Sequence, residues 1–259
     1  FETASEIFMI KTPAEILKMR AAGKILSRIL SEVAAAADEG VTLKDLDNLA
    51  RGLLKKNRAT AAFLGYKPAG ADRPFPAALC TSLNDVVVHG VPTRRRLEEG
   101  DILKLDFGVS YGGYSADAAV TLAIGRVREK ARHLIKATEE ALAKAIAAIK
   151  PGKTLGDLGY AIMSTASAYG FKIVKGLVGH GIGKKVHEAP EVFNEGRPGA
   201  GLELKPGMTL AIEPMLSLGS PWVRKLADDS YATVDGSLAA QFEHTILVTE
   251  TGAEVLTMI

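Results

Sequence analysis

The sequence predicts an α+β fold in which helices cover one face of a largely antiparallel sheet. Three observations support this fold class: helical patterns precede a group of strands, the same order occurs a second time, and two short motifs recur at similar offsets. Helices followed by runs of strands are typical of α+β architecture. At 259 residues, the chain is long enough for one large core or for two tightly joined halves.

Amphipathic helices are predicted at the beginning of each half. Apolar residues recur at intervals of three and four from Ile16 to Ala37, which is the spacing of one helix face. Residues 128–149 have the same character, with apolar residues from Leu134 to Ile149. A second helix is expected after each of these, because a threonine is followed by an aspartate three residues later, as in a capping box.

Two motifs occur twice and in the same order. Residues 40–46, GVTLKDL, match residues 152–158, GKTLGDL, at an offset of 152 − 40 = 112. Residues 97–106, LEEGDILKLD, match residues 204–213, LKPGMTLAIE, at an offset of 213 − 106 = 107. We therefore predict a duplicated chain that forms a single domain over residues 9–259, with pseudo-repeats at about 9–125 and 126–259.

Composition argues against several classes of function. The formal charge is +2, from 32 basic and 30 acidic residues, so no large field for nucleic acid is expected. No apolar run approaches the roughly 18 residues that cross a bilayer. Cys80 is the single cysteine, which excludes an internal disulfide and fits a reducing compartment. We expect a cytoplasmic monomer that binds neither membranes nor specific nucleic-acid sequences.

The first eight residues do not resemble a targeting sequence. They lack the basic and apolar regions of a signal peptide. Because Met9 is a plausible start, we expect residues 1–8 to be either a cloning remnant or the end of a longer N-terminal extension.

Two acids in one predicted hairpin indicate a metal site. With the loop centred on Tyr111 and Gly112, the numbers of paired residues sum to 223, so Asp106 faces Asp117. Directly opposed like charges destabilise a sheet, and a divalent cation between them would remove the conflict. The residues alone leave open a second interpretation, in which Asp106 is an edge or turn acid and Asp117 is a surface residue.

Three residues of the second half are further candidate ligands. Glu213 takes the place of Asp106 in the repeat, and Glu243 lies in an apolar strand, where a buried acid needs a partner. His180 lies in GHGIG, whose glycines permit close approach. Four carboxylates and an imidazole would balance two divalent ions and favour manganese, iron(II) or cobalt. These residues by themselves fit a metal-dependent phosphoesterase equally well.

Other titratable side chains are interpreted as structural. His133 lies among basic residues on a polar helix face and is expected to be solvated. His244 should point to the opposite sheet face from Glu243, because side chains alternate along a strand. We expect Cys80 to be a small apolar residue of a pocket wall rather than a nucleophile.

The candidate ligands and their local motifs resemble the signature of methionine aminopeptidases. The likeness runs from about Met9 to the C-terminus and comprises Asp106, Asp117, His180 in GHGIG, Glu213 in AIEP and Glu243 in QFEHT. It implies the pita-bread fold, with pseudo-twofold halves and a curved sheet. It also implies removal of the initiator methionine from nascent polypeptides with a small second residue, either free or at the ribosome. The short segment between His187 and Glu213 favours the type I enzymes.

The resemblance implies a role for each ligand. Asp117 and Glu243 would bridge two divalent ions, Asp106 would complete one site, and His180 with Glu213 would complete the other. A metal-bound hydroxide would attack the scissile carbonyl. A monovalent cation is also implied near main-chain oxygens of Asn84 and Val86, in a place that the sequence cannot test.

Catalytic and substrate-binding residues follow from the same resemblance. The catalytic residues would be His89, His187 and Glu213, with Glu213 relaying a proton and the two histidines contacting the substrate. The substrate-binding residues would be His89, His187, Phe63, Tyr66, Phe75, Cys80 and Val186. Phe63 and Val186 depart from the family in size, and the loop around residues 67–74 is longer. The family's pocket tryptophan has no clear counterpart, so Tyr231 and Trp222 are both candidates.

Two rival functions share this fold. Prolidases and aminopeptidases P usually have an extra N-terminal domain, whereas only about ten residues precede the first helix here. Fold relatives that bind RNA or protein without catalysis, such as the proliferation-associated proteins, tend to lose ligands. All five ligands are present in this sequence, which favours an enzyme.

Overall fold

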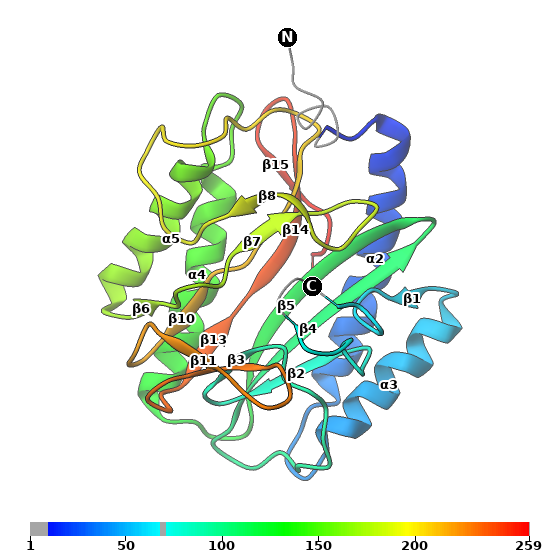
Figure 1. Ribbon diagram of the computed structural model, residues 1–259, viewed down its shortest axis with the longest axis vertical. Helices are drawn as coiled ribbons and strands as arrows, with labels where there is room; N and C mark the ends of the chain where they lie inside the picture. Colours follow the sequence, from blue (N-terminus) through cyan, green and yellow to red (C-terminus); the bar gives the residue numbers. More distant parts are fainter. Residues whose placement is uncertain (1–9, 68–70, 259) are drawn as a thin grey trace.

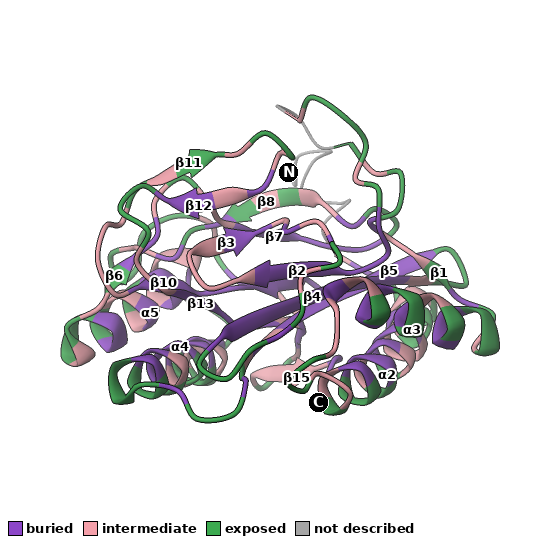
Figure 2. Cartoon of the chain, turned by 90° about the horizontal axis from the view of Figure 1, so that it is seen from below, coloured by how far each residue is buried: buried purple, intermediate pink, exposed green. Residues whose placement is uncertain are grey.

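The computed structural model describes residues 10–67 and 71–258. Within these residues, four helices lie on one face of a curved antiparallel sheet, and loops with short strands cover the other face (Figures 1 and 2). The predicted α+β class and the order of helices and strands are confirmed. Residues 1–8, for which two origins are predicted, lie outside the described residues. None of the described helices has both the length and the apolar character that spanning a membrane requires.

Helix α2 (Pro13–Ala35) has the amphipathic pattern expected from the sequence. Thr12 caps it: the Thr12 hydroxyl accepts from the Glu15 amide, and the Glu15 carboxylate accepts from the Thr12 amide. Gly23 lies on the buried face, where an added Cβ would be 2.1 Å from the carbonyl oxygen of Leu256. The C-terminal segment can therefore approach α2 closely only because Gly23 has no side chain.

The halves repeat the same connection at the start of their second helices, α3 (Leu43–Lys56) and α5 (Leu155–Tyr169). Thr42 and Thr154 both form capping boxes with the aspartate three residues later. Each threonine also forms an isolated bridge, Thr42 to Arg96 and Thr154 to Glu203. These bridged positions differ by 154 − 42 = 112 and 203 − 96 = 107, the two offsets found in the sequence. The duplicated fold is confirmed, while the division of one domain at residues 125 and 126 stays a prediction.

The large sheet has nine strands in the order β1-β4-β5-β14-β9-β7-β8, with β2 on β4 and β15 on β14. Two three-stranded sheets, β13-β10-β6 and β11-β12-β3, flank it. The remaining helix is α4 (Glu129–Ala148). The strands are β1 (Thr60–Ala61), β2 (Cys80–Leu83), β3 (Val86–Val88), β4 (Ile102–Tyr111), β5 (Tyr114–Ala123), β6 (Lys172–Ile173), β7 (Gly179–Gly181), β8 (Glu188–Val192), β9 (Thr209–Ile212), β10 (Met215–Ser217), β11 (Val223–Lys225), β12 (Tyr231–Thr233), β13 (Ala239–Gln241), β14 (Glu243–Val248) and β15 (Ala253–Val255).

The predicted register of the β4-β5 hairpin is wrong by two residues. Asp106 pairs with Ala119 and Asp117 pairs with Gly108, so the numbers of paired residues sum to 225. The turn consists of Gly112 and Gly113, whose φ angles of 61° and 82° suit a two-residue hairpin turn. Because the error is an even number of residues, both aspartates still point to one face, as diagonal rather than opposed neighbours.

Alternation along β4 separates the core from the candidate site. Leu103, Leu105 and Phe107 are buried in the apolar cluster that includes residues of α2 and α3. Lys104 and Asp106 therefore point to the opposite sheet face, away from the helices. In the second half, α4 and α5 pack against β9 and β14 in an equivalent apolar cluster. The helical layer thus supports both halves of the sheet and leaves its other face for polar residues.

Candidate metal centre

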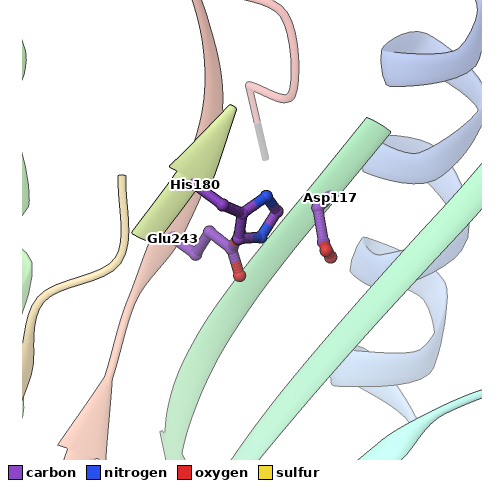
Figure 3. A group of neighbouring side chains, drawn as sticks. All are labelled: Asp117, His180 and Glu243. Carbon is purple, nitrogen blue, oxygen red and sulfur yellow. The ribbon is translucent and has the colours of Figure 1, made fainter. Parts of the chain in front are cut away.

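Three of the predicted ligands come from three strands of the large sheet and converge on the face without helices. Asp117 of β5, His180 of β7 and Glu243 of β14 each offer an atom within 4.8 Å of the others (Figure 3). All three side chains are buried. The pairing of β14 with both β5 and β9, and of β7 with β9, brings together residues that are more than sixty positions apart in the sequence.

The other two predicted ligands border this group. Asp106 lies on β4 as the diagonal neighbour of Asp117, and both side chains line the same cavity. Glu213 follows directly after β9, and its Oε1 atom is 3.7 Å from Nε2 of His180. Gln241 donates from Nε2 to Glu213 Oε2 at 3.1 Å. All five predicted ligands therefore lie around one centre.

Burial disfavours the charged form of the carboxyl groups of the centre. It raises the pKa of Asp106 to about 7 and raises the pKa values of Asp117, Glu213 and Glu243 well above their ordinary range. Repulsion between neighbouring carboxylates adds to the effect for the latter three. Burial also lowers the pKa of His180 to about 4, so this imidazole is neutral at pH 7.

Unsatisfied polar atoms show that this donor set fits divalent cations. Asp106 Oδ1, Asp117 Oδ1 and Glu243 Oε1 are buried without a hydrogen-bond partner. A buried oxygen left in this way costs about 1 to 3 kcal/mol, and more if it is charged. His180 Nδ1 is 2.9 Å from the carbonyl oxygen of Gly181, to which it can donate, and this leaves Nε2 free to bind a metal. Oxygen-rich donors with one imidazole suit manganese, iron or cobalt.

A cavity of about 480 Å³ opens onto the centre. Its lining includes the five predicted ligands and six of the seven predicted substrate-binding residues: Phe63, Tyr66, Phe75, Cys80, His89 and His187. Val186 is not part of the lining and is buried in the apolar cluster with Phe63 and Cys80. The two candidates for the missing pocket tryptophan differ, since Tyr231 lines the cavity and Trp222 is 62% exposed.

Both non-ligand histidines lie against aromatic side chains of the cavity. His187 Nδ1 is 2.9 Å from the hydroxyl of Tyr66, and its ring centre is 4.2 Å from that of His180. The His89 ring packs edge-on against Tyr231, with the ring centres 5.9 Å apart. Burial lowers the pKa of His187 to about 3 and also lowers that of His89. Both imidazoles are therefore neutral at pH 7.

Comparison with known proteins identifies the family of this chain. The family model described as "Metallopeptidase family M24" matches residues 17–250. The chain belongs to metallopeptidase family M24. The prediction that it is a metallopeptidase is confirmed by this match, which spans all five candidate ligands.

Similar members of the M24 family are named methionine aminopeptidases. The relative from Clostridium acetobutylicum is 44% identical, with 97% of this chain and 99% of the relative covered. The relative from Aquifex aeolicus is 45% identical, with 94% and 96% covered. The crystal structure of methionine aminopeptidase from Thermotoga maritima has a TM-score of 0.92 at 45% identity, with 96% and 99% covered. The resemblance inferred from the motifs, and the enzyme class that it implies, are confirmed.

The rival prolidases share the fold but match less well. Prolidase from Pyrococcus furiosus has a TM-score of 0.77 at 26% identity, and the match covers 98% of this chain but only 67% of the prolidase. This difference in length agrees with the extra segment that is expected of prolidases. The fold class inferred from the resemblance is thus confirmed by methionine aminopeptidase and prolidase structures together.

Three polar residues that support the M24 centre were not found from the sequence. Gln241 holds Glu213, and Asn194 Nδ2 donates to the Glu213 carbonyl oxygen at 3.0 Å. Thr245 Oγ1 accepts from the Asp117 amide and donates to the Asp117 carbonyl oxygen, both at 2.8 Å. Alternation around Glu243 could have indicated Gln241 and Thr245, which lie two positions to either side. His244 points away, toward Thr257, as predicted.

Proposed function

We propose that this chain is a type I methionine aminopeptidase that removes the initiator methionine from polypeptides with a small second residue. One observation carries the proposal: four buried carboxyl groups and a neutral imidazole meet at one end of a cavity with aromatic walls. Full-length relatives named methionine aminopeptidases support the substrate. We further propose that it acts as a cytoplasmic monomer on nascent chains, some of them at the ribosome.

The proposed cofactors are two divalent ions, either cobalt, manganese or iron(II). Asp106, Asp117, His180, Glu213 and Glu243 would hold them. When bound, such ions supply a nucleophile at neutral pH and polarise the scissile carbonyl. They would also relieve the unsatisfied carboxylate oxygens, so that loading with metal and stabilisation of the folded chain would be coupled.

Glu213 is suited to moving the proton that the reaction releases. It lies at the edge of the centre. Gln241 donates a hydrogen bond to its Oε2 atom, and its Oε1 atom lies 3.7 Å from Nε2 of His180. A carboxyl group whose pKa is raised by burial can accept a proton from the nucleophile and return it to the leaving amine at neutral pH.

His187 is suited to stabilising the substrate oxygen. If the Tyr66 hydroxyl donates to Nδ1 of His187, the proton of this neutral imidazole is on Nε2 and can be donated to the tetrahedral intermediate. The position of His187 between Tyr66 and His180 places it beside the centre. His89, held against Tyr231 on the cavity wall, would orient the substrate.

The cavity walls suit an unbranched apolar side chain. Phe63, Tyr66, Phe75 and Tyr231 surround a space of about 480 Å³, and the buried thiol of Cys80 adds a small apolar surface. Aromatic edges contact thioether sulfur favourably. Burial raises the pKa of the Cys80 thiol, in agreement with a lining residue rather than a nucleophile.

A competition between peptides tests the proposed substrate. Protein loaded with manganese would be given Met-Ala-Ser, Leu-Ala-Ser and Ala-Pro-Ser, and the released amino acid would be measured. We expect cleavage of Met-Ala-Ser with kcat/KM at least about 100-fold above the other two, as a shaped apolar pocket allows. Preference for Ala-Pro-Ser would instead assign a proline-directed peptidase. Absence of all cleavage at full metal occupancy would contradict an aminopeptidase.

A further inference from the structure

Lys104 is a fully buried lysine next to the candidate metal centre. It lies on β4, two positions before Asp106 and on the same face of the strand, and its relative exposure is 0%. Its Nζ atom donates to the main-chain carbonyl oxygens of Asn84 at 2.7 Å and Ala239 at 2.9 Å. A buried ammonium group is costly unless it is well coordinated, so this arrangement needs an explanation.

The two carbonyl groups are held in place independently of the lysine. Asn84 has a left-handed φ of 53° in the turn between β2 and β3. Its side chain accepts from the Ile102 amide at 3.0 Å and donates to Asp101 at 2.9 Å. The Ala239 amide donates to the Asn84 carbonyl oxygen at 3.1 Å. These contacts orient two main-chain oxygens from distant segments toward a single point.

Main-chain oxygens that point at one position are the usual ligands of potassium and sodium ions. The resemblance to methionine aminopeptidases implies such an ion near the oxygens of Asn84 and Val86. In this chain, however, the Asn84 oxygen already accepts from Lys104 and from Ala239. The expected exchangeable cation therefore does not fit the residues present.

We infer that the Lys104 ammonium is a built-in substitute for an exchangeable monovalent cation. A lysine ammonium is a compact single charge with three donors, so it can take the position of a potassium or sodium ion between carbonyl oxygens. The chain should consequently fold and function without potassium or sodium. This inference does not depend on the proposed peptide substrate, because it concerns the stability of the fold as well as activity.

Lys104 is also a positioning residue for the metal centre. The Ala239 oxygen that it holds is at the start of β13, which continues to Gln241 and then to Glu243. Gln241 contacts Glu213, and the Gln241 main chain is held by the Thr121 hydroxyl on the strand beside Lys104. Loss of the Lys104 cation should therefore be transmitted through residues 239–243 to two predicted ligands.

A comparison of salts tests the inference on the metal-loaded protein. Tm and kcat/KM would be measured in potassium, sodium and tetramethylammonium chloride at equal ionic strength. All measurements would be made at one fixed pH, so that the cation of the salt is the single variable. For the wild-type chain we expect the same Tm and kcat/KM in all three salts. A saturable rise with potassium or sodium would overturn the inference.

Substitution of Lys104 provides the second arm. Lys104→Ala leaves space between the carbonyl groups and should lower Tm by roughly 10 °C in tetramethylammonium. Potassium or sodium should restore about half of that loss, with a matching recovery of kcat. Lys104→Met fills the space without a charge and should not respond to either ion. Lys136→Ala, at an exposed helix position, controls for general salt effects.

The outcomes separate a cation substitute from a purely structural lysine. If Lys104→Ala folds and binds metal but shows no ion-specific recovery, the inference is wrong. If Lys104→Ala does not fold, the comparison of salts on the wild-type protein still shows whether an exchangeable cation is needed. Crystals of the wild-type protein soaked in rubidium chloride provide an independent readout, since anomalous density beside Asn84 and Ala239 would show an exchangeable site and contradict the inference.

Discussion

Asp47 and the four carboxyl groups of the metal centre are all buried, but their charges are balanced in different ways. Asp47 on α3 has a side chain with 0% exposure, yet it pairs with Lys44 at 2.9 Å and Arg51 at 2.8 Å. It also accepts from the Ala78 amide at 2.8 Å. Burial acts to raise its pKa, but these partners outweigh burial and the net shift is downward.

The metal centre has no such partners. Within residues 10–67 and 71–258, no lysine or arginine forms an ion pair with Asp106, Asp117, Glu213 or Glu243. The pKa values of these four carboxyl groups are raised instead of lowered. A buried acid with cationic partners from its own chain can thus keep its charge in the folded state, whereas the buried acids of the centre have a donor set that fits added cations.

The largest expected effect comes from removing one carboxylate of the centre. Asp117→Asn should lower kcat/KM by about 10³-fold or more, because several kcal/mol of transition-state stabilisation depend on bound metal. Metal content, measured by elemental analysis, should fall with activity while the circular dichroism spectrum is unchanged. Glu191 is an exposed carboxylate that lines the same cavity, so Glu191→Gln is the matched control and should retain its metal content and its activity. Full activity of Asp117→Asn would refute the assigned centre.

The corresponding change at Asp47 should affect stability and leave metal content unchanged. Asp47→Asn removes the partner of Lys44 and Arg51 and should lower the free energy of unfolding by about 3 kcal/mol. The value would be measured by urea denaturation, with the exposed Asp38→Asn as control. If Asp47→Asn lost metal but kept its stability, Asp47 would have to be counted with the metal centre and the proposed difference would be wrong.

The pH dependence of the metal-free protein should reveal the raised pKa values. The folded chain holds protons on these carboxyl groups at pH values where the unfolded chain has lost them, so stability is greatest below the unfolded pKa and is lost as pH rises toward 7. The slope should be about 1.4 kcal/mol per pH unit for each such group. Denaturation between about pH 5 and pH 8, with chelator and with manganese, checks this. A flat metal-free profile would contradict it.

The smallest expected effect concerns the orientation of His187. Tyr66→Phe removes the hydroxyl that contacts Nδ1 and keeps the aromatic wall. We expect kcat to fall by about 5- to 10-fold, the equivalent of one hydrogen bond, with little change in KM. Steady-state kinetics on Met-Ala-Ser would measure both values. A change confined to KM would show that Tyr66 serves the pocket and not the histidine.

Much of the fold could be predicted because it depends on local patterns. The capping boxes at Thr42 and Thr154 and the spacing of apolar residues in α2 are properties of short segments. The predicted hairpin register is wrong because the turn at Gly112 and Gly113 lies one residue further along the chain than the predicted turn at Tyr111 and Gly112, which shifts the pairing by two residues. Its consequence for the site was small, since a shift of two preserves the face of the sheet.

The predicted ligands converge, but their supporting residues could not be derived from spacing. No motif or spacing in the sequence indicated a role for Lys104 or Asp47. The contacts of Lys104 with Ala239 and of Asp47 with Ala78 join positions that are distant in the sequence. Val186 shows the same limitation, because its neighbour His187 lines the cavity while Val186 is buried in an apolar cluster.

The amino-acid sequence was sufficient to predict the α+β class, the duplication and the identity of the candidate ligands. These follow from periodicity, repeated motifs and acids placed within apolar strands. The three-dimensional arrangement was needed to find which charges are buried and which of them are balanced from within the chain. Asp47 pairs with Lys44 and Arg51 on its own helix. Lys104 donates to carbonyl oxygens of two distant segments. Within residues 10–67 and 71–258, the four acids of the centre have no lysine or arginine partner. Helical spacing alone can place Lys44 and Arg51 beside Asp47. Whether a charged side chain is buried, and which backbone groups enclose it, depends on contacts between distant segments, which no local pattern specifies.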